Sequence, residues 1–83
     1  MNSGSVLVTL TPLLREVFNE PTLVVTPDLT ASEVRGWDSL GHVRLFFEIE
    51  QTFSIRFEPG EISSLERVGE IADLIATKIE SSK

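Results

Sequence analysis

The chain contains no cysteine, and its 83 residues include only one histidine, one methionine and one tryptophan. Without cysteine it forms no disulfide bond and offers no thiolate ligand to a metal ion. A domain of this size buries only about 60% of the surface of its unfolded chain, so it supports a single small core. Because 41% of the residues are hydrophobic, we expect the packing of apolar side chains to supply the stability.

Basic residues are also scarce. Seven lysines and arginines stand against thirteen acidic residues, which leaves a net charge of −6. Proteins that bind nucleic acid need basic patches that neutralise phosphates, so we expect no nucleic-acid partner. An acidic surface instead favours an encounter with a basic partner surface.

Long apolar runs are missing as well. No segment approaches the roughly 20 apolar residues that span a membrane. The run Val6-Leu7-Val8-Thr9-Leu10 lacks the basic leader and the small-residue cleavage site of a signal peptide. We therefore expect a cytoplasmic protein with no membrane partner. We also expect a free-standing monomer, with residues 1–83 as a single domain and flexible ends at residues 1–5 and 81–83.

Apolar residues at helical spacing predict an all-α fold. The first helix should begin at about Val6 or Thr11 and end at Phe18, although the alternating residues at its start would by themselves suggest a strand. If this helix begins at Val6, it contains Pro12, which removes one helical hydrogen bond and should kink it.

Three further helices are expected at residues 39–52, 61–64 and 68–80, so the chain predicts a small four-helix bundle with three main helices and one short one. The buried stripe of the second helix is expected to consist of Leu40, Val43, Phe46, Phe47 and Phe53. The buried stripe of the last helix is expected to consist of Val68, Ile71, Ala72, Ile75 and Ile79. Ile55 and Phe57 should anchor the loop between the second and third helices.

Residues 20–38 form an unusually long connection, broken by Pro21, Pro27 and Gly36. Nineteen residues without regular structure are uncommon in a compact domain unless the segment has a function. The connection is nevertheless rich in apolar residues that can hold it on the core. These residues are Leu23, Val24, Val25, Leu29 and Val34.

The connection ends in Gly36-Trp37-Asp38-Ser39-Leu40, directly before the second helix. Asp38 is suited to be the N-cap, with its side chain accepting a hydrogen bond from the backbone N–H of Leu40 or Gly41. Ser39 then lies where the first helical N–H groups are unpaired and the helix dipole is positive, so a phosphate attached there would be stabilised. Trp37 is expected to pack over the start of the helix.

Asp38-Ser39-Leu40 in this setting resembles the modification site of the acyl carrier proteins. The resemblance continues through Phe53-Ser54-Ile55-Arg56-Phe57, and then through Ile62, Leu65, Val68, Ile71 and Ile75. It implies a helical bundle in which a long ordered loop joins the first and second helices.

The resemblance also implies a chemistry. A separate phosphopantetheinyl transferase would attach the 4′-phosphopantetheine of coenzyme A covalently to Ser39, with Asp38 helping to position the metal and the donor and Leu40 completing the motif. The thiol of that arm would carry an acyl or aminoacyl group as a thioester. The chain itself would not be an enzyme. Its partners would be that transferase, a loading ligase, and downstream synthase or transferase enzymes.

In the family the second helix also faces partner enzymes. The residues expected to dock partners are Leu40, Val43, Arg44, Phe47, Glu48 and Ile62. Carrier proteins of fatty-acid synthesis tend to have acidic residues where this chain has Gly41 and Arg44. Because Arg44 would be repelled by a wholly basic partner groove, we expect a specialised pathway rather than housekeeping lipid synthesis.

Phe46 and Phe47 are a second departure from the family pattern. Carrier proteins that hide long acyl chains between their helices usually line that space with aliphatic residues. Aromatic rings fill more volume and leave less room in a close-packed interior. We therefore expect a short or polar cargo that stays outside the bundle.

Other interpretations remain open. The chain could be a helical interaction module in which Ser39 is only a helix cap, or it could be a peptidyl or aminoacyl carrier. A Ser–His nucleophilic pair of Ser39 with His42 is disfavoured because no orienting group or oxyanion hole is evident, and we expect His42 to be exposed. A Gly-Asp-Ser-Leu hydrolase is excluded because Trp37 replaces the glycine, the chain is too short, and no downstream Asp-x-x-His follows.

Overall fold

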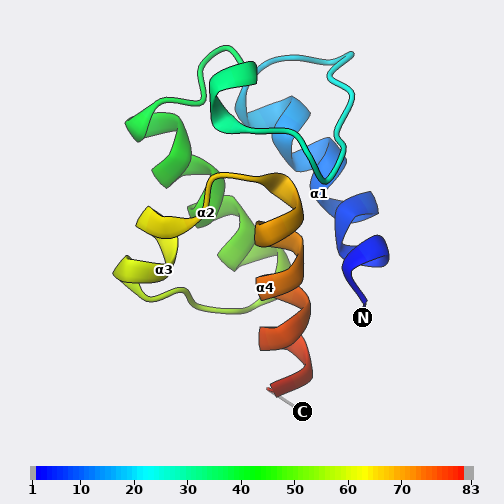
Figure 1. Cartoon of the computed structure of the whole chain (residues 1–83), viewed down its shortest axis with the longest axis vertical. Helices are drawn as coiled ribbons and strands as arrows, with labels where there is room; N and C mark the ends of the chain where they lie inside the picture. The colour runs from blue at the N-terminus through cyan, green and yellow to red at the C-terminus, as the bar shows by residue number, and fades with distance from the viewer. Residues whose placement is uncertain (1, 82–83) are drawn as a thin grey trace.

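The computed structural model describes residues 2–81, in which four α-helices and one short 3-10 helix follow one another (Figure 1). Their bounds are α1 Ser3–Val17, η1 Ala31–Glu33, α2 Ser39–Phe53, α3 Pro59–Ser64 and α4 Val68–Ser81. Helix α1 packs against both α2 and α4, and the described residues contain no β-strand. The predicted all-α bundle of three main helices and one short helix is confirmed. None of the helices within residues 2–81 has the length and hydropathy that a membrane crossing requires.

Helix α1 begins earlier than the sequence predicted. The side-chain oxygen of Asn2 accepts a hydrogen bond from the N–H of Ser5 at 2.9 Å, so the helix starts at Ser3 rather than at Val6 or Thr11. The strand-like alternation at its start is misleading because Val6 shares a buried helical face with the leucines that follow, whereas Val8 is 74% exposed. The flexible ends predicted at residues 1–5 and 81–83 lie partly outside the described residues. Residues 3–5 belong to α1 and residue 81 ends α4.

The long connection of residues 20–38 is ordered by the first turn of α4. The N–H groups of Val68 and Gly69 have no acceptor within their own helix, and they donate instead to the carbonyls of Leu29 and Pro27, at 3.0 and 2.9 Å. Leu29 and Val34 are buried, as predicted. The prediction for Val24 was wrong, since this side chain is 72% exposed.

Helix α2 buries a different face from the predicted one. Leu40, Val43 and Phe47 are 70%, 60% and 58% exposed, whereas Leu45, Phe46 and Ile49 form the buried side. The helix carries two apolar stripes, and helical spacing alone gave no reason to prefer one over the other. Only Phe46 was placed correctly in the fully buried set, and Phe53 is half-buried.

Gly41 explains why α2 turns this face inward. A Cβ atom at Gly41 would lie 2.2 Å from the carbonyl oxygen of Gly36 and 3.0 Å from the ring of Phe18. Gly36 itself adopts a φ of +88°, which favours glycine. The backbone of the connection therefore lies directly against the first turn of α2. This close approach fixes where the chain enters the helix.

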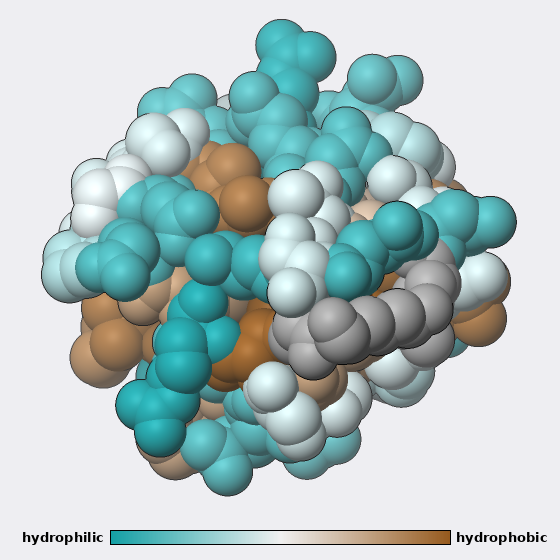
Figure 2. All heavy atoms as spheres, turned by 90° about the horizontal axis from the view of Figure 1, so that it is seen from below, coloured by the Kyte–Doolittle hydropathy of each residue, from teal (hydrophilic) through white to brown (hydrophobic). Residues whose placement is uncertain are grey.

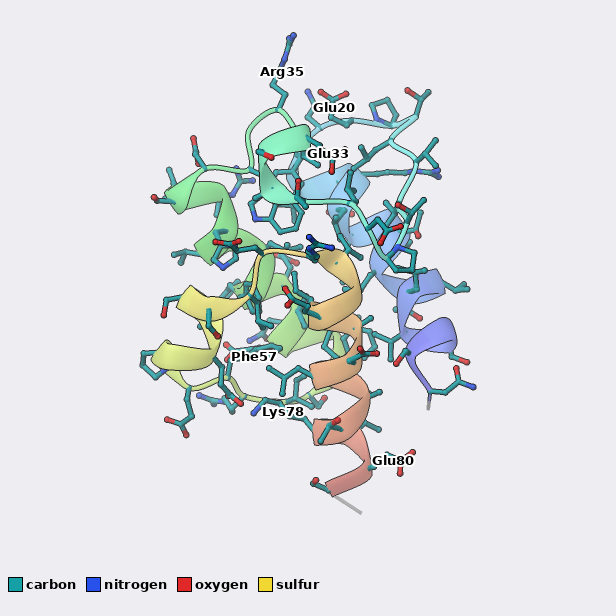
Figure 3. The ribbon with its side chains drawn as sticks, in the orientation of Figure 1. Glu20, Glu33, Arg35, Phe57, Lys78 and Glu80 are labelled. Carbon is teal, nitrogen blue, oxygen red and sulfur yellow. The ribbon has the colours of Figure 1, made fainter. Side chains whose placement is uncertain are left out.

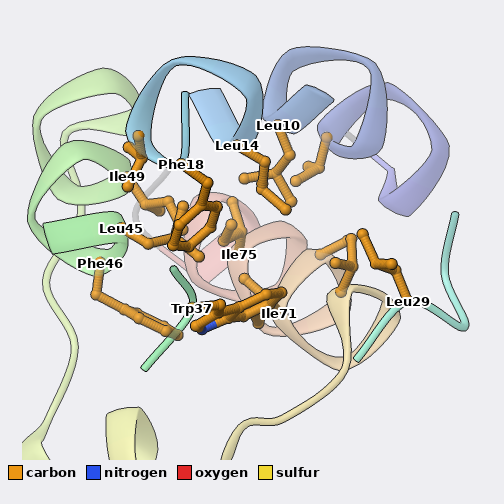
Figure 4. Close-up of a cluster of buried hydrophobic side chains, with 14 of the residues drawn as sticks. Leu10, Leu14, Phe18, Leu29, Trp37, Leu45, Phe46, Ile49, Ile71 and Ile75 are labelled. Atoms are coloured by element: carbon orange, nitrogen blue, oxygen red, sulfur yellow. The ribbon is translucent and has the colours of Figure 1, made fainter. Parts of the chain in front are cut away.

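The core lies between the three long helices and the connection (Figure 4). Its most completely buried side chains come from all three helices and include Leu10, Leu14, Leu45, Ile49, Ile71 and Ile75. The predicted burial of Val68, Ile71, Ala72 and Ile75 is confirmed, while Ile79 is half-buried. Viewed from below, hydrophilic residues cover much of the molecule and hydrophobic ones show in patches between them (Figure 2).

Helix α3 is held on the bundle by the loop before it and by α4. Ile55 and Phe57 anchor the loop, as predicted. The Lys78 ammonium lies 5.4 Å from the centre of the Phe57 ring (Figure 3) and 2.9 Å from a carboxylate oxygen of Glu61. The hydrogen bond from the backbone N–H of Glu58 holds the pKa of Glu61 below its ordinary value, and the hydrogen bond from Lys78 adds a smaller effect in the same direction. Helix α3 is thereby tied to α4 at one end.

The close contact at Gly41 gives a stability prediction. Gly41→Ala should lower the free energy of unfolding by about 1–3 kcal/mol, because the added methyl group meets backbone that has no room to retreat. Gly60→Ala is the matched control: it lies in the first turn of α3 with no heavy atom within 4 Å of the added carbon, and should be neutral or stabilising by up to about 1 kcal/mol. Urea unfolding followed by circular dichroism measures both. Equal free energies of unfolding for the two variants would contradict the close contact between Gly41 and the backbone of the connection.

Candidate functional site

The N-terminus of α2 presents Ser39 to solvent. Asp38 is the N-cap, and its Oδ1 accepts the N–H of Gly41 at 2.8 Å, which confirms the predicted cap. Within residues 2–81 no acceptor takes the N–H of Ser39 or of Leu40, as is usual for the first residues of a helix. The side chains of Asp38, Ser39 and Leu40 are all exposed. Ser39 thus combines an accessible hydroxyl with the positive end of a 15-residue helix.

A groove of about 610 Å³ begins at Ser39 and runs between α2 and α3. We call it the Ser39 groove. Its walls are mostly apolar, and their polar members are Asp38, Ser39, His42, Ser63 and Glu66. The lining residues are Ala31, Trp37, Asp38, Ser39, His42, Val43, Pro59, Ile62, Ser63, Leu65 and Glu66.

A continuous row of five rings, the aromatic row, runs from the groove wall into the core and consists of Phe18, Trp37, His42, Phe46 and Phe57, of which Trp37 and His42 line the groove. Successive ring centres are 5.4, 6.1, 4.7 and 4.8 Å apart along this order. The last pair meets edge to face at 83°, a favourable aromatic geometry. Trp37 and Phe46 lie along the same side of the core cluster (Figure 4). The predicted packing role of Trp37 is confirmed, since only 6% of it is exposed.

His42 forms a hydrogen-bonded bridge through both ring nitrogens. The indole Nε1–H of Trp37 donates to His42 Nδ1 at 2.9 Å, and His42 Nε2 lies 2.6 Å from the carbonyl oxygen of Ile62. An indole nitrogen only donates and a carbonyl only accepts, so the geometry assigns a neutral ring with its hydrogen on Nε2. His42 is therefore half-buried and engaged, and the prediction that it is exposed was wrong.

This bridge also argues against nucleophilic chemistry at Ser39. A general base must have a free nitrogen within hydrogen-bond reach of the hydroxyl. Both nitrogens of His42 are already occupied by Trp37 and Ile62. Within the described residues Ser39 has no hydrogen-bonded base.

Two of the residues predicted to dock partners, Val43 and Ile62, line the Ser39 groove. Leu40, Val43, Arg44 and Phe47 are exposed on α2, and Glu48 beside them is half-buried. Ile62 comes from α3 on the opposite wall. Val43 also lines a second depression, together with Arg44, Phe47 and Glu48, against Glu16 and Val17 of α1. The docking role of all six residues stays a prediction.

Comparison with known proteins assigns the family. Residues 8–75 match the family model described as the phosphopantetheine attachment site. The chain belongs to the acyl carrier proteins. It is 28% identical over 82 residues to the acyl carrier protein of Acidothermus cellulolyticus, with 99% of this chain and 98% of that protein covered.

Two solved structures share the fold. The holo acyl carrier protein of Geobacter metallireducens superimposes with a TM-score of 0.85 and 37% identity, over 92% of this chain and 87% of that one. The acyl carrier protein of Thermotoga maritima superimposes with a TM-score of 0.86 over 100% of this chain and 96% of that one, and at 24% identity it supports the fold alone.

Acyl carrier proteins bear covalently attached 4′-phosphopantetheine and are carriers rather than enzymes. The residues present here fit that cofactor. An exposed serine hydroxyl stands at a helix N-terminus whose first two N–H groups have no acceptor among residues 2–81, which suits a phosphate. The apolar Ser39 groove next to it can cover an uncharged arm.

Two parts of the site were not anticipated from the sequence. One is the approach of Gly36 to Gly41, and the other is the bridge from Trp37 through His42 to Ile62. Two glycines at this spacing, and a tryptophan five residues before a histidine, were the available signals. Neither signal predicts a contact until the connection is known to fold back over α2.

The bridge predicts one tautomer. The uncharged imidazole ring of His42 should carry its hydrogen on Nε2, because Nδ1 accepts the hydrogen bond from Trp37. Trp37→Phe keeps a ring for stacking but removes the donor, so the Nδ1-protonated form should become detectable. Long-range nitrogen–proton NMR correlations of the single histidine measure the populations directly. A wild-type ring protonated on Nδ1 would contradict the bridge.

Proposed function

We propose that Ser39 is the attachment residue for the phosphopantetheine arm. The observation that carries the proposal is the exposed hydroxyl of Ser39 on the first residue of α2, at the mouth of the Ser39 groove. In the attachment step the Ser39 oxygen forms a bond to the phosphorus that bears the pantetheine of coenzyme A. The bond to the other phosphate breaks, adenosine 3′,5′-bisphosphate leaves, and the serine proton passes to a base of the transferase.

The chain positions this step without catalysing it. Asp38 uses Oδ1 to cap the helix, while Oδ2 has no partner among residues 2–81 and stays exposed. That oxygen is available to a metal ion held by the transferase, which is the role we assign to Asp38. Once bound, the arm supplies a thiol that holds an acyl or aminoacyl group as a thioester. Leu40 is exposed beside Ser39 and offers the transferase an apolar contact.

We further propose that the carrier serves a dedicated pathway rather than general fatty-acid synthesis. Arg44 is exposed between the apolar residues Leu40, Val43 and Phe47, and within residues 2–81 it forms no salt bridge. A partner that fits this face would combine an apolar depression with a carboxylate opposite Arg44. A wholly basic docking groove would meet like charge there, which slows association and selects against that partner.

The attachment site is tested by mass spectrometry after incubation with coenzyme A and a phosphopantetheinyl transferase. Wild type should gain the mass of the arm once, and Ser39→Ala should gain none. Ser63→Ala is the matched control, because Ser63 lines the same groove, and it should be loaded like wild type. If wild type stays unmodified, the alternative of a helical interaction module with a capping serine is supported instead.

The charge argument is tested with a fatty-acid ketosynthase as the assay enzyme. Arg44→Glu should raise the association rate of the loaded carrier with this enzyme by at least about tenfold at low salt, because it replaces repulsion with attraction. Arg56→Glu makes the same change in net charge at the far end of α2, just beyond its C-terminus, and should have little effect. A wild-type protein that is already as active as a carrier of fatty-acid synthesis would contradict the proposal.

A further inference from the structure

The space between α2 and α3 is closed on the side of the core. Phe46 is 1% exposed and Phe57 is 8% exposed, and their rings meet at 4.8 Å behind His42. Next to them Leu45, Ile49, Ile71 and Ile75 are at most 1% exposed. Because protein interiors are close-packed, this buried cluster has no room for an added alkyl chain unless side chains move.

His42 is the side chain that separates the Ser39 groove from this interior. Its ring lines the groove and lies 4.7 Å from the ring of Phe46 behind it. His42 contacts the carbonyl oxygen of Ile62, which lies in the last turn of α3. Carbonyl oxygens in the last turn of a helix receive no hydrogen bond from an N–H group of the same helix. Rotating the ring would break two hydrogen bonds at once and leave both partners unpaired, so the closed position is strongly favoured.

We propose that His42, supported by Phe46, determines the cargo of this carrier by keeping it out of the bundle. The proposal rests on the attachment of the arm to Ser39. The cargo then stays in the Ser39 groove, whose 610 Å³ lies within the usual size range of small-ligand sites. Groups that can remain there are short acyl groups or polar ones able to contact Ser63 and Glu66. A long alkyl chain would have to lie in the open groove, because the bundle has no enclosed apolar space to shield it from water.

The test compares acyl chain lengths on the intact protein. Apo protein is loaded from acetyl-, butyryl- and octanoyl-coenzyme A by a phosphopantetheinyl transferase, and methyl NMR shifts are recorded. In wild type, all three cargoes should shift only groove methyls such as those of Val43 and Ile62, and the interior methyls of Leu45, Ile49 and Ile75 should not move. Interior shifts with octanoyl-loaded wild type would overturn the proposal.

Two variants open the barrier in different ways. His42→Ala removes the bridge, and Phe46→Leu leaves the bridge but replaces the ring behind it with a smaller aliphatic side chain. Octanoyl loading should then shift the interior methyls of at least one folded variant, while acetyl loading should not. Val24→Ala, at a side chain of the connection that is 72% exposed and does not line the groove, should behave like wild type. If octanoyl stays outside in both variants, His42 and Phe46 do not set the limit.

A second route separates failure of this proposal from failure of the attachment site. Because the chain has no cysteine, Ser39→Cys provides a unique thiol that N-octyl iodoacetamide can alkylate without a transferase. The attached octyl chain should leave the interior methyls unshifted, and adding His42→Ala should let it shift them. If wild type cannot be loaded by the transferase, the attachment proposal fails, and this route still decides the role of His42.

Discussion

The contact of the Gly36 carbonyl with the first turn of α2 is the constraint on which the site depends. It brings the end of a nineteen-residue connection directly onto the helix at Gly41, where any side chain would collide. From this contact follow the capping of α2 by Asp38, the burial of Trp37 against Phe18, and the exposure of Ser39. A serine at a helix start is common in proteins. What distinguishes this one is that the backbone before it is held tightly while its hydroxyl is left free.

The same arrangement explains why a carrier needs other enzymes. The positive end of α2 would stabilise a phosphate on Ser39, but both nitrogens of the His42 imidazole are hydrogen-bonded, to Trp37 and to Ile62. The hydroxyl is therefore accessible without being reactive. Modification of such a residue would require a second protein to supply the base and the metal ion. We proposed that this protein binds the exposed apolar residues of α2.

The sequence predicted the buried face of a helix correctly where the helix has only one apolar stripe. Helix α4 has one apolar stripe, and its buried residues Val68, Ile71, Ala72 and Ile75 were identified correctly. Helix α2 has two apolar stripes, and spacing alone selected the exposed one because it cannot tell a buried apolar face from an exposed one. The start of α1 was misplaced because its β-branched residues suggest a strand, whereas Asn2 and the partners of Val6 in the core make it helical.

The site could be predicted only in its local part. Asp38 and Ser39 are neighbours in sequence, and a cap with an adjacent serine can be recognised from their order. The His42 bridge joins residues 37, 42 and 62, and depends on α3 lying across the groove from α2. No pattern along the chain reports such a contact, so His42 was expected to be exposed. The features that this carrier's sequence did not reveal are thus contacts between residues that are distant along the chain.

The most direct measurement is the location of the arm on wild-type protein. Peptide fragmentation by mass spectrometry, after incubation with coenzyme A and a phosphopantetheinyl transferase, assigns the added mass to one residue. The exposed hydroxyl at the N-terminus of α2 predicts that this residue is Ser39 in every modified molecule. Modification of any other serine, with the hydroxyl of Ser39 left free, would contradict it.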